Sequence, residues 1–315
     1  MIKDRCQVIC NWAKLSYTSD CLYPDRSYDS TFHHGILQGG NILSRICTTN
    51  RLFKDIIYEL PFLVKLIDTK WFSNARWFQK KGACICEVVL HDWITLSKND
   101  ETISGISILK IAVKEIIDSR IERESDRQVY KNLYNVPFIL TKIEFSSKET
   151  PLVIINGSDF IAYLYDAVNN KIFIAALLKA VKERKSFQSG RGFFKFDYSG
   201  IGVLDSIEYK VCARDKGTTN TIITIDKSYV VKIYRILQPG TSLEIMITEN
   251  LIETGFSNIP KPLGHCTYLG RKNISYPVLF IQEYIENQGD AWEILCAEIY
   301  NYSKEQLGNS SESSE

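Results

Sequence analysis

The chain has almost no net charge. Its 315 residues include 38 Lys and Arg against 37 Asp and Glu, which gives a formal net charge of +1. Without an excess of one sign, no long-range field draws the protein to nucleic acid or to an anionic membrane surface. The two locally basic stretches, 120–127 and 179–185, also contain acids and are typical of solvated helix faces. We therefore expect no nucleic acid and no membrane among its partners.

Long apolar runs, targeting signals and cysteine pairs are also missing. The best apolar run, residues 172–178, ends at Lys179, whereas a membrane-spanning helix needs roughly 20 apolar residues. Residues 1–5 show no signal peptide, which favours the cytoplasm. The nine cysteines are scattered and include no C-x-x-C pair, so we expect reduced thiols, with neither a disulfide framework nor a zinc site.

The chain does contain enough apolar material for ordinary cores. Hydrophobic residues make up 45% of the sequence, and the length suggests about two domains. Apolar residues fall near helical spacing over 50–70, with Pro61 as an interruption, and residues 166–184 are typical of one amphipathic helix. Strands are predicted over 86–94, 107–113, 150–155, 193–196 and 206–212. A turn is predicted at 156–157, a flexible break at 188–192 and a disordered polar tail over 308–315.

The segment 214–292 carries most of the chemical interest. It contains, in order, a polar hairpin over 215–222, a strand with a lysine, a helix with acids and an apolar strand over 278–285. The lysine is Lys232, in the middle of the strand 228–234. This is the order of parts in the nucleotide-holding lobe of a kinase.

A strand lysine held by a helix glutamate is the device with which kinases bind the α and β phosphates of a nucleotide. The ammonium group neutralises phosphate oxygens, and the carboxylate fixes the lysine in one rotamer. Lys232 fits the first role, and Glu244 is the preferred partner, with Glu249 in mid-helix as its competitor. Two simpler interpretations stay open. Lys232 can be a strand-end lysine that reaches solvent, and Glu244 can close a capping box with Thr241 at the start of the helix.

Other parts of the segment are candidates for nucleotide contacts. The hairpin offers backbone N–H groups and hydroxyls to a phosphate, although it lacks the G-x-G-x-x-G spacing and an ordinary surface hairpin is an equal alternative. The end of the apolar strand would pair with adenine through its backbone, as a hinge does. Asp290 either caps a helix that starts at Ala291 or contacts ribose or an acceptor. The predicted contacts beyond Lys232 and Glu244 are Thr218, Thr219, Asn220, Thr221, Glu283, Tyr284, Ile285 and Asp290.

Four short motifs follow one another along the chain. They are Arg76-Trp77-Phe78-Gln79-Lys80-Lys81-Gly82, Thr219-Asn220-Thr221, Val231-Lys232-Ile233-Tyr234-Arg235-x-x-x-Pro239-Gly240 and Asn287-Gln288-Gly289-Asp290-x-Trp292. In order and spacing the chain resembles the maltokinase family, sugar kinases with a fold akin to aminoglycoside phosphotransferases. The resemblance covers residues 61–300.

The resemblance implies an α+β fold. A cap subdomain over 61–150, made of a curved antiparallel sheet with a helix, would precede a kinase N-lobe-like antiparallel sheet with one helix over 151–286. The second subdomain would hold ATP, with Lys232 as the phosphate lysine. Residues 1–60 would be an extension of unknown role, and 287–315 the start of a C-lobe helix and a polar tail. In such enzymes a helical C-lobe binds the sugar, and the γ-phosphate passes to the anomeric hydroxyl of maltose with Mg²⁺.

The sequence departs from the family after Trp292. None of the four histidines begins the family's His-x-Asp loop, and too few residues follow for a compact catalytic lobe. We therefore expect the helical C-lobe to be absent, and no catalytic residue or metal ligand in this chain. One hypothesis is the N-terminal portion of a maltokinase-like enzyme, which phosphorylates maltose or a maltooligosaccharide only with a complementing C-lobe chain. The alternative is a non-catalytic binding or regulatory protein of the same fold. Either would expose apolar surface and favour self-association.

Overall fold

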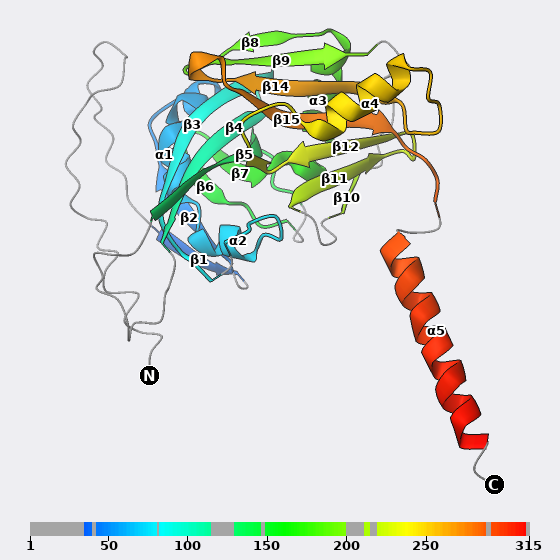
Figure 1. The fold of residues 1–315 in the computed structure, drawn as a ribbon. Coiled ribbons are helices and arrows are strands. Elements are labelled where there is room, and N and C mark those ends of the chain that lie inside the picture. The colour runs from blue at the N-terminus through cyan, green and yellow to red at the C-terminus, as the bar shows by residue number, and fades with distance from the viewer. Residues whose placement is uncertain are drawn as a thin grey trace. The chain divides into compact units, whose positions relative to one another are not determined.

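The structure is a computed structural model of the chain (Figure 1). The chain separates into a short unit, Met1–Thr31, and a large one, Phe32–Glu315, and every element described here belongs to the large unit. The described residues are 35–39, 42–80, 82–114, 129–145, 149–199, 211–214, 219–287 and 291–312.

The large unit contains a strongly curved, eight-stranded sheet, called sheet A. Its strand order is β1-β2-β6-β7-β5-β4-β3, and β13 pairs with β5 beside this path. Neighbouring strands are antiparallel except β2 and β6. The strands are β1 (Gly35–Gly39), β2 (Ile42–Thr48), β3 (Cys84–Lys98), β4 (Thr102–Lys114), β5 (Val129–Thr141), β6 (Val153–Asn156), β7 (Ile161–Asp166) and β13 (Ile236–Leu237).

Sheet A confirms the strands predicted over 86–94, 107–113 and 150–155, although the last starts at Val153. The predicted turn after Asn156 closes the β6–β7 hairpin, with the Gly157 N–H donating to the Phe160 carbonyl at 2.8 Å. The proposed subdomain limits stay predictions. Sheet A takes strands from both sides of residue 61 and of residue 150.

Short helices precede β3 and cover sheet A. They are η1 (Phe53–Glu59), α1 (Leu60–Leu66) and α2 (Thr69–Asn74). Pro61 does not interrupt the predicted helical stretch, because it lies in the first turn of α1, where no N–H partner is required. Phe78, which follows α2, stacks on Tyr134 of β5 with ring centroids 5.4 Å apart, and both are fully buried. This aromatic contact anchors the first predicted family motif in the core of sheet A.

A second sheet, sheet B, has seven antiparallel strands in the order β10-β11-β12-β15-β14-β9-β8. They are β8 (Ser186–Gln188), β9 (Phe193–Tyr198), β10 (Val211–Arg214), β11 (Asn220–Ile225), β12 (Tyr229–Tyr234), β14 (Pro262–Leu269) and β15 (Ser275–Glu283), with η4 (Arg271–Asn273) between the last two. The strand predicted over 193–196 is confirmed. Of the one predicted over 206–212, the described part begins at Val211. The fold is thus α+β, with a curved sheet followed by an antiparallel sheet.

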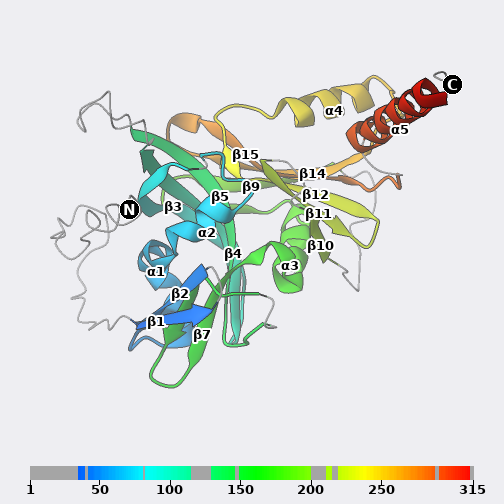
Figure 2. The same cartoon turned by 90° about the horizontal axis from the view of Figure 1, so that it is seen from below.

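Helices α3 (Lys171–Lys182) and α4 (Leu243–Glu253) cover opposite faces of sheet B, as Figure 2 shows. Alternate residues of each strand point to the α3 face, where Ile223, Val231 and Cys266 are buried. Helix α3 is shorter than the predicted 166–184. The chain first completes β7 and a turn of 3₁₀ helix, η3 (Ala167–Asn169), and the Asn170 side chain then caps the helix.

Arg235, just after β12, joins the two sheets through a buried guanidinium group. Its side chain is 1% exposed. Its Nη2 lies 2.7 Å from Asp166 Oδ2 in sheet A, and its Nε lies 2.8 Å from Thr221 Oγ1 in sheet B. Nη1 also donates to the Asn135 carbonyl at 3.4 Å, and the Trp77 ring lies 5.0 Å away. Residues from three of the four predicted family motifs therefore meet at this cation.

Asp92 of β3 forms a second junction between the sheets. Its buried carboxylate accepts from the Ser189 hydroxyl at 2.6 Å and from the Tyr268 hydroxyl at 2.9 Å. It also accepts from the backbone N–H groups of Gly190 and Arg191, both at 3.1 Å. The prediction of a flexible break at 188–192 is wrong, because this turn wraps around a carboxylate and is held by it.

The last described element is α5 (Ala291–Glu312), which starts where the sequence predicts a helix. The predicted disordered tail is wrong for residues 308–312, which continue this helix. Among the described residues, no helix has the length and apolar composition needed to cross a membrane.

Candidate functional site

The face of sheet B under α4 carries a row of side chains from four adjacent strands. Lys232 of β12 pairs with Phe280 of β15, Phe280 pairs with His265 of β14, and His265 pairs with Asp197 of β9. Residues directly opposite each other in antiparallel strands project to the same face. Phe280 is buried in the middle of the row, whereas the polar members stay partly accessible. Helix α4 lies across this row (Figure 2).

The structure brings Lys232 and Glu244 into direct contact. Lys232 Nζ lies 2.6 Å from Glu244 Oε2, and the side chains are 26% and 37% exposed. The Tyr234 hydroxyl donates to the same carboxylate oxygen at 3.0 Å and lies 3.1 Å from Ser242 Oγ. Burial, with Glu244 as a further cause, raises the pKa of the Tyr234 phenol, so it stays a neutral donor. The carboxylate is therefore held by two donors, while the lysine side chain stays partly exposed.

The capping-box prediction for Glu244 is wrong. Ser242, not Thr241, caps α4, and its hydroxyl oxygen accepts from the Ile245 N–H at 3.5 Å. Gly240, which lies just before Thr241 in the segment that leads into α4, has a φ of +116°, a conformation that glycine adopts without strain. Because Ser242 satisfies the helix start, the Glu244 carboxylate is free to reach Lys232. Glu249 contacts His265 instead, with 3.6 Å between Oε1 and Nδ1.

The predicted hairpin residues separate in space. Thr218 lies outside the described residues, and Thr219 is exposed before β11. Asn220 is directly opposite Tyr234, on the face that carries Lys232. Thr221 points to the other face, where it is fully buried and its hydroxyl accepts from the guanidinium of Arg235. Of the described hairpin side chains, Asn220 shares the face of Lys232, and Thr221 serves the junction between the sheets.

The predicted hinge follows the end of β15. The Glu283 N–H donates to the Lys261 carbonyl and the Tyr284 N–H to the Ser228 carbonyl, both at 2.9 Å. The Ile285 N–H makes no hydrogen bond to any described residue. Pairing of adenine with a backbone amide would therefore fall to Ile285. Asp290 lies outside the described residues.

Sequence reasoning missed three members of this site: Tyr234, His265 and Asp197. The period of two in a strand already places Tyr234 on the same face as Lys232, so this signal could have found it. His265 and Asp197 depend on which strands lie side by side in sheet B. No local pattern in the sequence gives that order.

Mg²⁺ is the metal that the family resemblance implies. The described part of the chain holds no group of three or more His, Cys, Asp or Glu side chains close enough to bind a metal ion. We therefore assign no Mg²⁺ ligand to the described residues.

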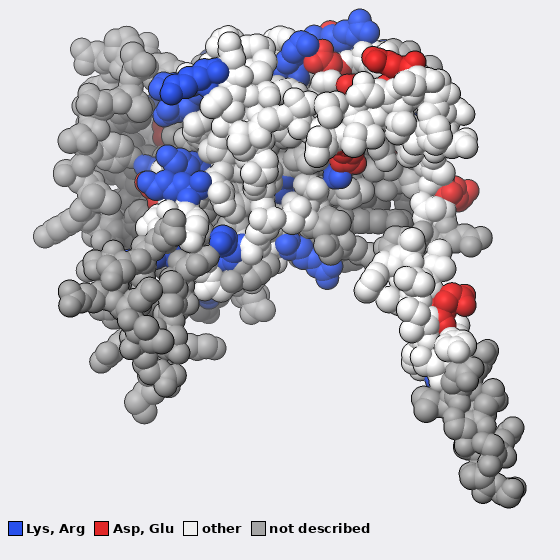
Figure 3. Space-filling model, viewed as in Figure 1, with Lys and Arg blue, Asp and Glu red and all other residues white. Residues whose placement is uncertain are grey.

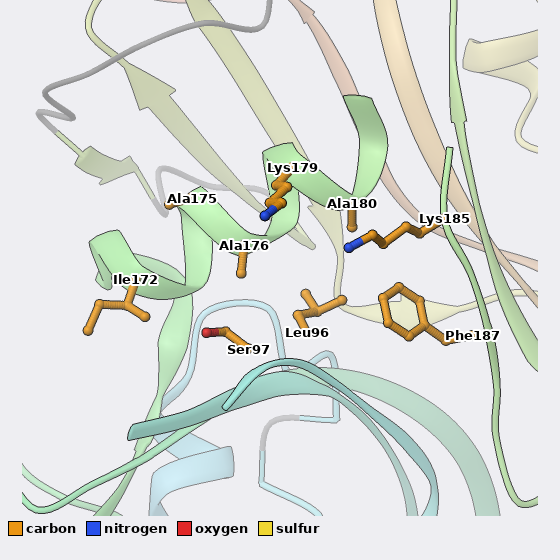
Figure 4. A pocket seen from close by; sticks show the side chains of 9 residues that line it. All are labelled: Leu96, Ser97, Ile172, Ala175, Ala176, Lys179, Ala180, Lys185 and Phe187. Atoms are coloured by element: carbon orange, nitrogen blue, oxygen red, sulfur yellow. The ribbon is translucent and has the colours of Figure 1, made fainter. Parts of the chain in front are cut away.

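A hollow of about 410 Å³ lies apart from Lys232, on the α3 side of sheet B (Figure 4). It is lined by Leu96, Ser97, Ile172, Ala175, Ala176, Lys179, Ala180, Lys185 and Phe187. The two lysines at its rim both lie near Glu183, with Nζ–carboxylate distances of 3.9 Å for Lys179 and 2.7 Å for Lys185. The hollow is therefore a separate cavity from the Lys232 face, and most of its lining is apolar.

The face of the molecule that includes α4 is largely uncharged. Figure 3 shows small, separate groups of basic and acidic side chains among its described residues, without a continuous basic band. A ligand would therefore be recognised by individual groups such as Lys232 rather than by a broad positive surface.

No family model matches the chain, and no curated protein matches it. Three solved structures of glucosamine kinase show a distant likeness: a complex with glucosamine, ADP and inorganic phosphate, and crystal forms A and B. Their sequence identities are 13%, 12% and 11%, and each has a TM-score of 0.44. The likeness covers 74% of this chain and 42%, 43% and 42% of theirs, so the chain spans less than half of their length. A TM-score of 0.44 is too low for this likeness to support a conclusion about function.

Proposed function

We propose that the α4 face of sheet B binds the phosphates of ATP. The observation that carries this proposal is the 2.6 Å contact between Lys232, on strand β12, and Glu244, on helix α4, which covers this face. A lysine fixed by a helix carboxylate presents its remaining N–H groups to phosphate oxygens in a defined direction. The Tyr234 hydroxyl donates to the same carboxylate oxygen and so helps to orient Glu244, which in turn orients Lys232.

The neighbouring groups supply the rest of a nucleotide site in this proposal. Asn220 offers an amide side chain on the same face, next to the β10–β11 hairpin. At the other end of the strands, the Ile285 N–H would donate to the adenine ring. A site of this kind needs no global positive charge, which agrees with the formal net charge of +1.

We further propose that the chain is the nucleotide-holding portion of a sugar kinase of the maltokinase type, with maltose as the acceptor and Mg²⁺ as the metal. The four sequence motifs support this finer assignment. A complementing helical lobe would supply the acceptor site, and exposed apolar side chains on α4 and α5 support the need for a partner surface. These side chains are Leu243, Met246, Ile247, Trp292, Leu295, Ile299 and Tyr302.

The first test is isothermal titration calorimetry of the full chain with ATP and ADP, with and without Mg²⁺. Lys232→Ala should weaken binding at least about tenfold, because a charge-assisted hydrogen bond to phosphate contributes roughly 1.5–3 kcal/mol. The matched control is Lys227→Ala, which removes an exposed lysine of the β11–β12 turn that contacts Glu286 at 2.8 Å. Unaltered binding in Lys232→Ala, or equal losses in both variants, would contradict the assignment of the phosphate site.

The second test concerns the acceptor. The chain would be mixed with the separately produced helical lobe of a maltokinase, and transfer of ³²P from ATP to maltose would be measured. Transfer that requires both chains and is lost in Lys232→Ala supports the split-kinase assignment. Nucleotide binding without transfer in any such mixture would favour the alternative, a non-catalytic binding protein of the same fold.

A further inference from the structure

Helix α4 buries little apolar surface on sheet B. Of its residues, all of which the structure describes, Ile245 alone is fully buried, and Leu251 and Ile252 are partly buried. Leu243, Met246 and Ile247 point away from the sheet and are exposed. The polar contacts of the helix therefore carry an unusual share of its attachment.

Those polar contacts form two anchors, one on each side of Ile245. Glu244 reaches Lys232, and Glu249 reaches His265. Five residues of α-helix turn through about 140° beyond a full turn, so the two acids flank the sheet-facing side of α4. The first anchor is part of the proposed nucleotide site, and the second has no role there.

The second anchor is a histidine between two carboxylates. His265 Nδ1 lies 3.6 Å from Glu249 Oε1 on α4, and Nε2 lies 3.5 Å from Asp197 Oδ2 on β9. Both distances exceed the 2.7–2.9 Å of a charge-assisted hydrogen bond. A cavity of about 110 Å³ borders all three residues and Phe280, so there is room for the side chains to approach.

The two charge states of the imidazole differ in what they can hold. A neutral imidazole has one N–H donor and one lone pair, so it donates to one carboxylate and turns a lone pair to the other. A protonated imidazole donates to both. Protonation of His265 therefore allows hydrogen bonds to both Asp197 on β9 and Glu249 on α4, whereas the neutral ring can donate to one of them.

We propose that His265 is a positioning residue: when protonated, it clamps α4 to sheet B through Glu249 and so keeps Glu244 against Lys232. The effect on the nucleotide rests on the function proposed above, whereas the clamp itself does not. Because the clamp favours the protonated ring, α4 is held more firmly as the pH falls through the range in which histidine side chains titrate. The nucleotide affinity of the Lys232 site should rise in the same direction.

The other charged and titratable groups around His265 do not reverse the expected firmer attachment of α4 at lower pH. On β9, Lys195 Nζ lies 2.9 Å from Asp197 Oδ1 and shares that carboxylate with the histidine. Tyr198 on the same strand lines the cavity, and Phe280 is the neighbour on β15. Glu249 is the acid that faces the ring from α4. Two carboxylates therefore face the ring, and one ammonium group lies beside them.

The test compares ADP affinity at about pH 6 and pH 8 in the full chain and in His265→Gln. The ratio of the ADP affinity at pH 6 to that at pH 8 should be roughly two- to fivefold larger in the wild type than in His265→Gln. This is the range expected for a partly exposed ion pair. Glu249→Gln should remove the same difference, and His265→Arg should keep high affinity at both pH values. Glu253→Gln, at the exposed end of the same helix, is the matched control and should behave as the wild type.

A second readout separates the clamp from the proposed function. Hydrogen exchange of the α4 amides, corrected for intrinsic rates and measured without nucleotide, should be slower at pH 6 in the wild type but not in His265→Gln or Glu249→Gln. If this difference appears but ADP does not bind, the clamp holds and the proposed nucleotide site fails. If ADP binds through Lys232 but neither readout distinguishes the wild type from the two variants, the clamp is overturned.

Discussion

The charged contacts at Arg235 and at Lys232 differ in burial. Between sheets A and B, the Arg235 guanidinium is 1% exposed and contacts groups from both sheets. On the α4 face of sheet B, the side chains of Lys232 and Glu244 are 26% and 37% exposed. A buried cation with partners on both sheets fixes a geometry, whereas a partly exposed lysine keeps N–H groups that can donate to a ligand. Burial thus distinguishes residues that hold the two sheets together from residues that are accessible to a ligand.

The largest effect is expected from Arg235→Met. The substitution leaves Asp166 and the Thr221 hydroxyl without their cation, and breaking a buried pair in this way costs about 3–5 kcal/mol. Urea unfolding followed by circular dichroism measures the change in the free energy of unfolding. Lys227→Ala, which breaks an exposed pair, should leave the free energy of unfolding nearly unchanged. Similar losses in the two variants would remove the distinction between the buried and the exposed regions.

A smaller loss is expected from Asp92→Asn. The amide NH₂ must then face at least one of the donors that now surround the carboxylate, including the Gly190 and Arg191 N–H groups. An unsatisfied buried donor costs about 1–3 kcal/mol. Unfolding measurements give the loss, and faster hydrogen exchange confined to 189–191 would identify its origin. Unchanged stability would show that the turn does not depend on the carboxylate.

The junction at Asp92 should also make stability depend on pH through its neighbour His91. Burial, followed by the nearby Arg191, lowers the pKa of His91 in the folded state. The unfolded chain then binds more protons, so stability is present above the unfolded pKa of about 6.5 and falls as the pH drops below it. As the pH falls below about 6.5, the free energy of unfolding of the wild type should fall relative to that of His91→Gln, which lacks the titrating group. Parallel curves would contradict it.

The smallest effect on stability is expected from Tyr234→Phe, in the exposed region. It removes the hydroxyl that contacts Glu244 and Ser242 at a partly exposed site, and it leaves Lys232 in place. Because the hydroxyl orients the carboxylate, nucleotide affinity should fall by a few-fold while the unfolding midpoint moves little. A loss of stability comparable to that of Asp92→Asn would place Tyr234 with the structural residues instead.

The sequence predicted the local parts of this arrangement better than the long-range ones. The order of strand, helix and strand, and the choice of Lys232 and Glu244, came from local patterns, and the structure brings these two side chains together. Their role in nucleotide binding stays a prediction. The second anchor was not predicted, because His265 and Asp197 become neighbours only through the strand order of sheet B.

The sequence predictions for the turn at 188–192 and for Thr221 also differ from the structure because of contacts between distant segments. The turn at 188–192 has the composition of a loose loop, yet its donors bind a carboxylate on another sheet, 97 to 99 residues away in sequence. Thr221 belongs to a polar hairpin motif, but the alternation of β11 directs it to buried Arg235. In both cases the residue's contact is with a charged side chain on another segment, and the local sequence pattern gives no sign of it.

The most direct test of the central claim is a crystal structure of the chain with a non-hydrolysable ATP analogue. The account predicts phosphate oxygens within about 3 Å of Lys232 Nζ, with the Glu244 contact retained and the adenine at Ile285. Nucleotide bound in the hollow beside Lys179 and Lys185, or no bound nucleotide at saturating concentration, would contradict it.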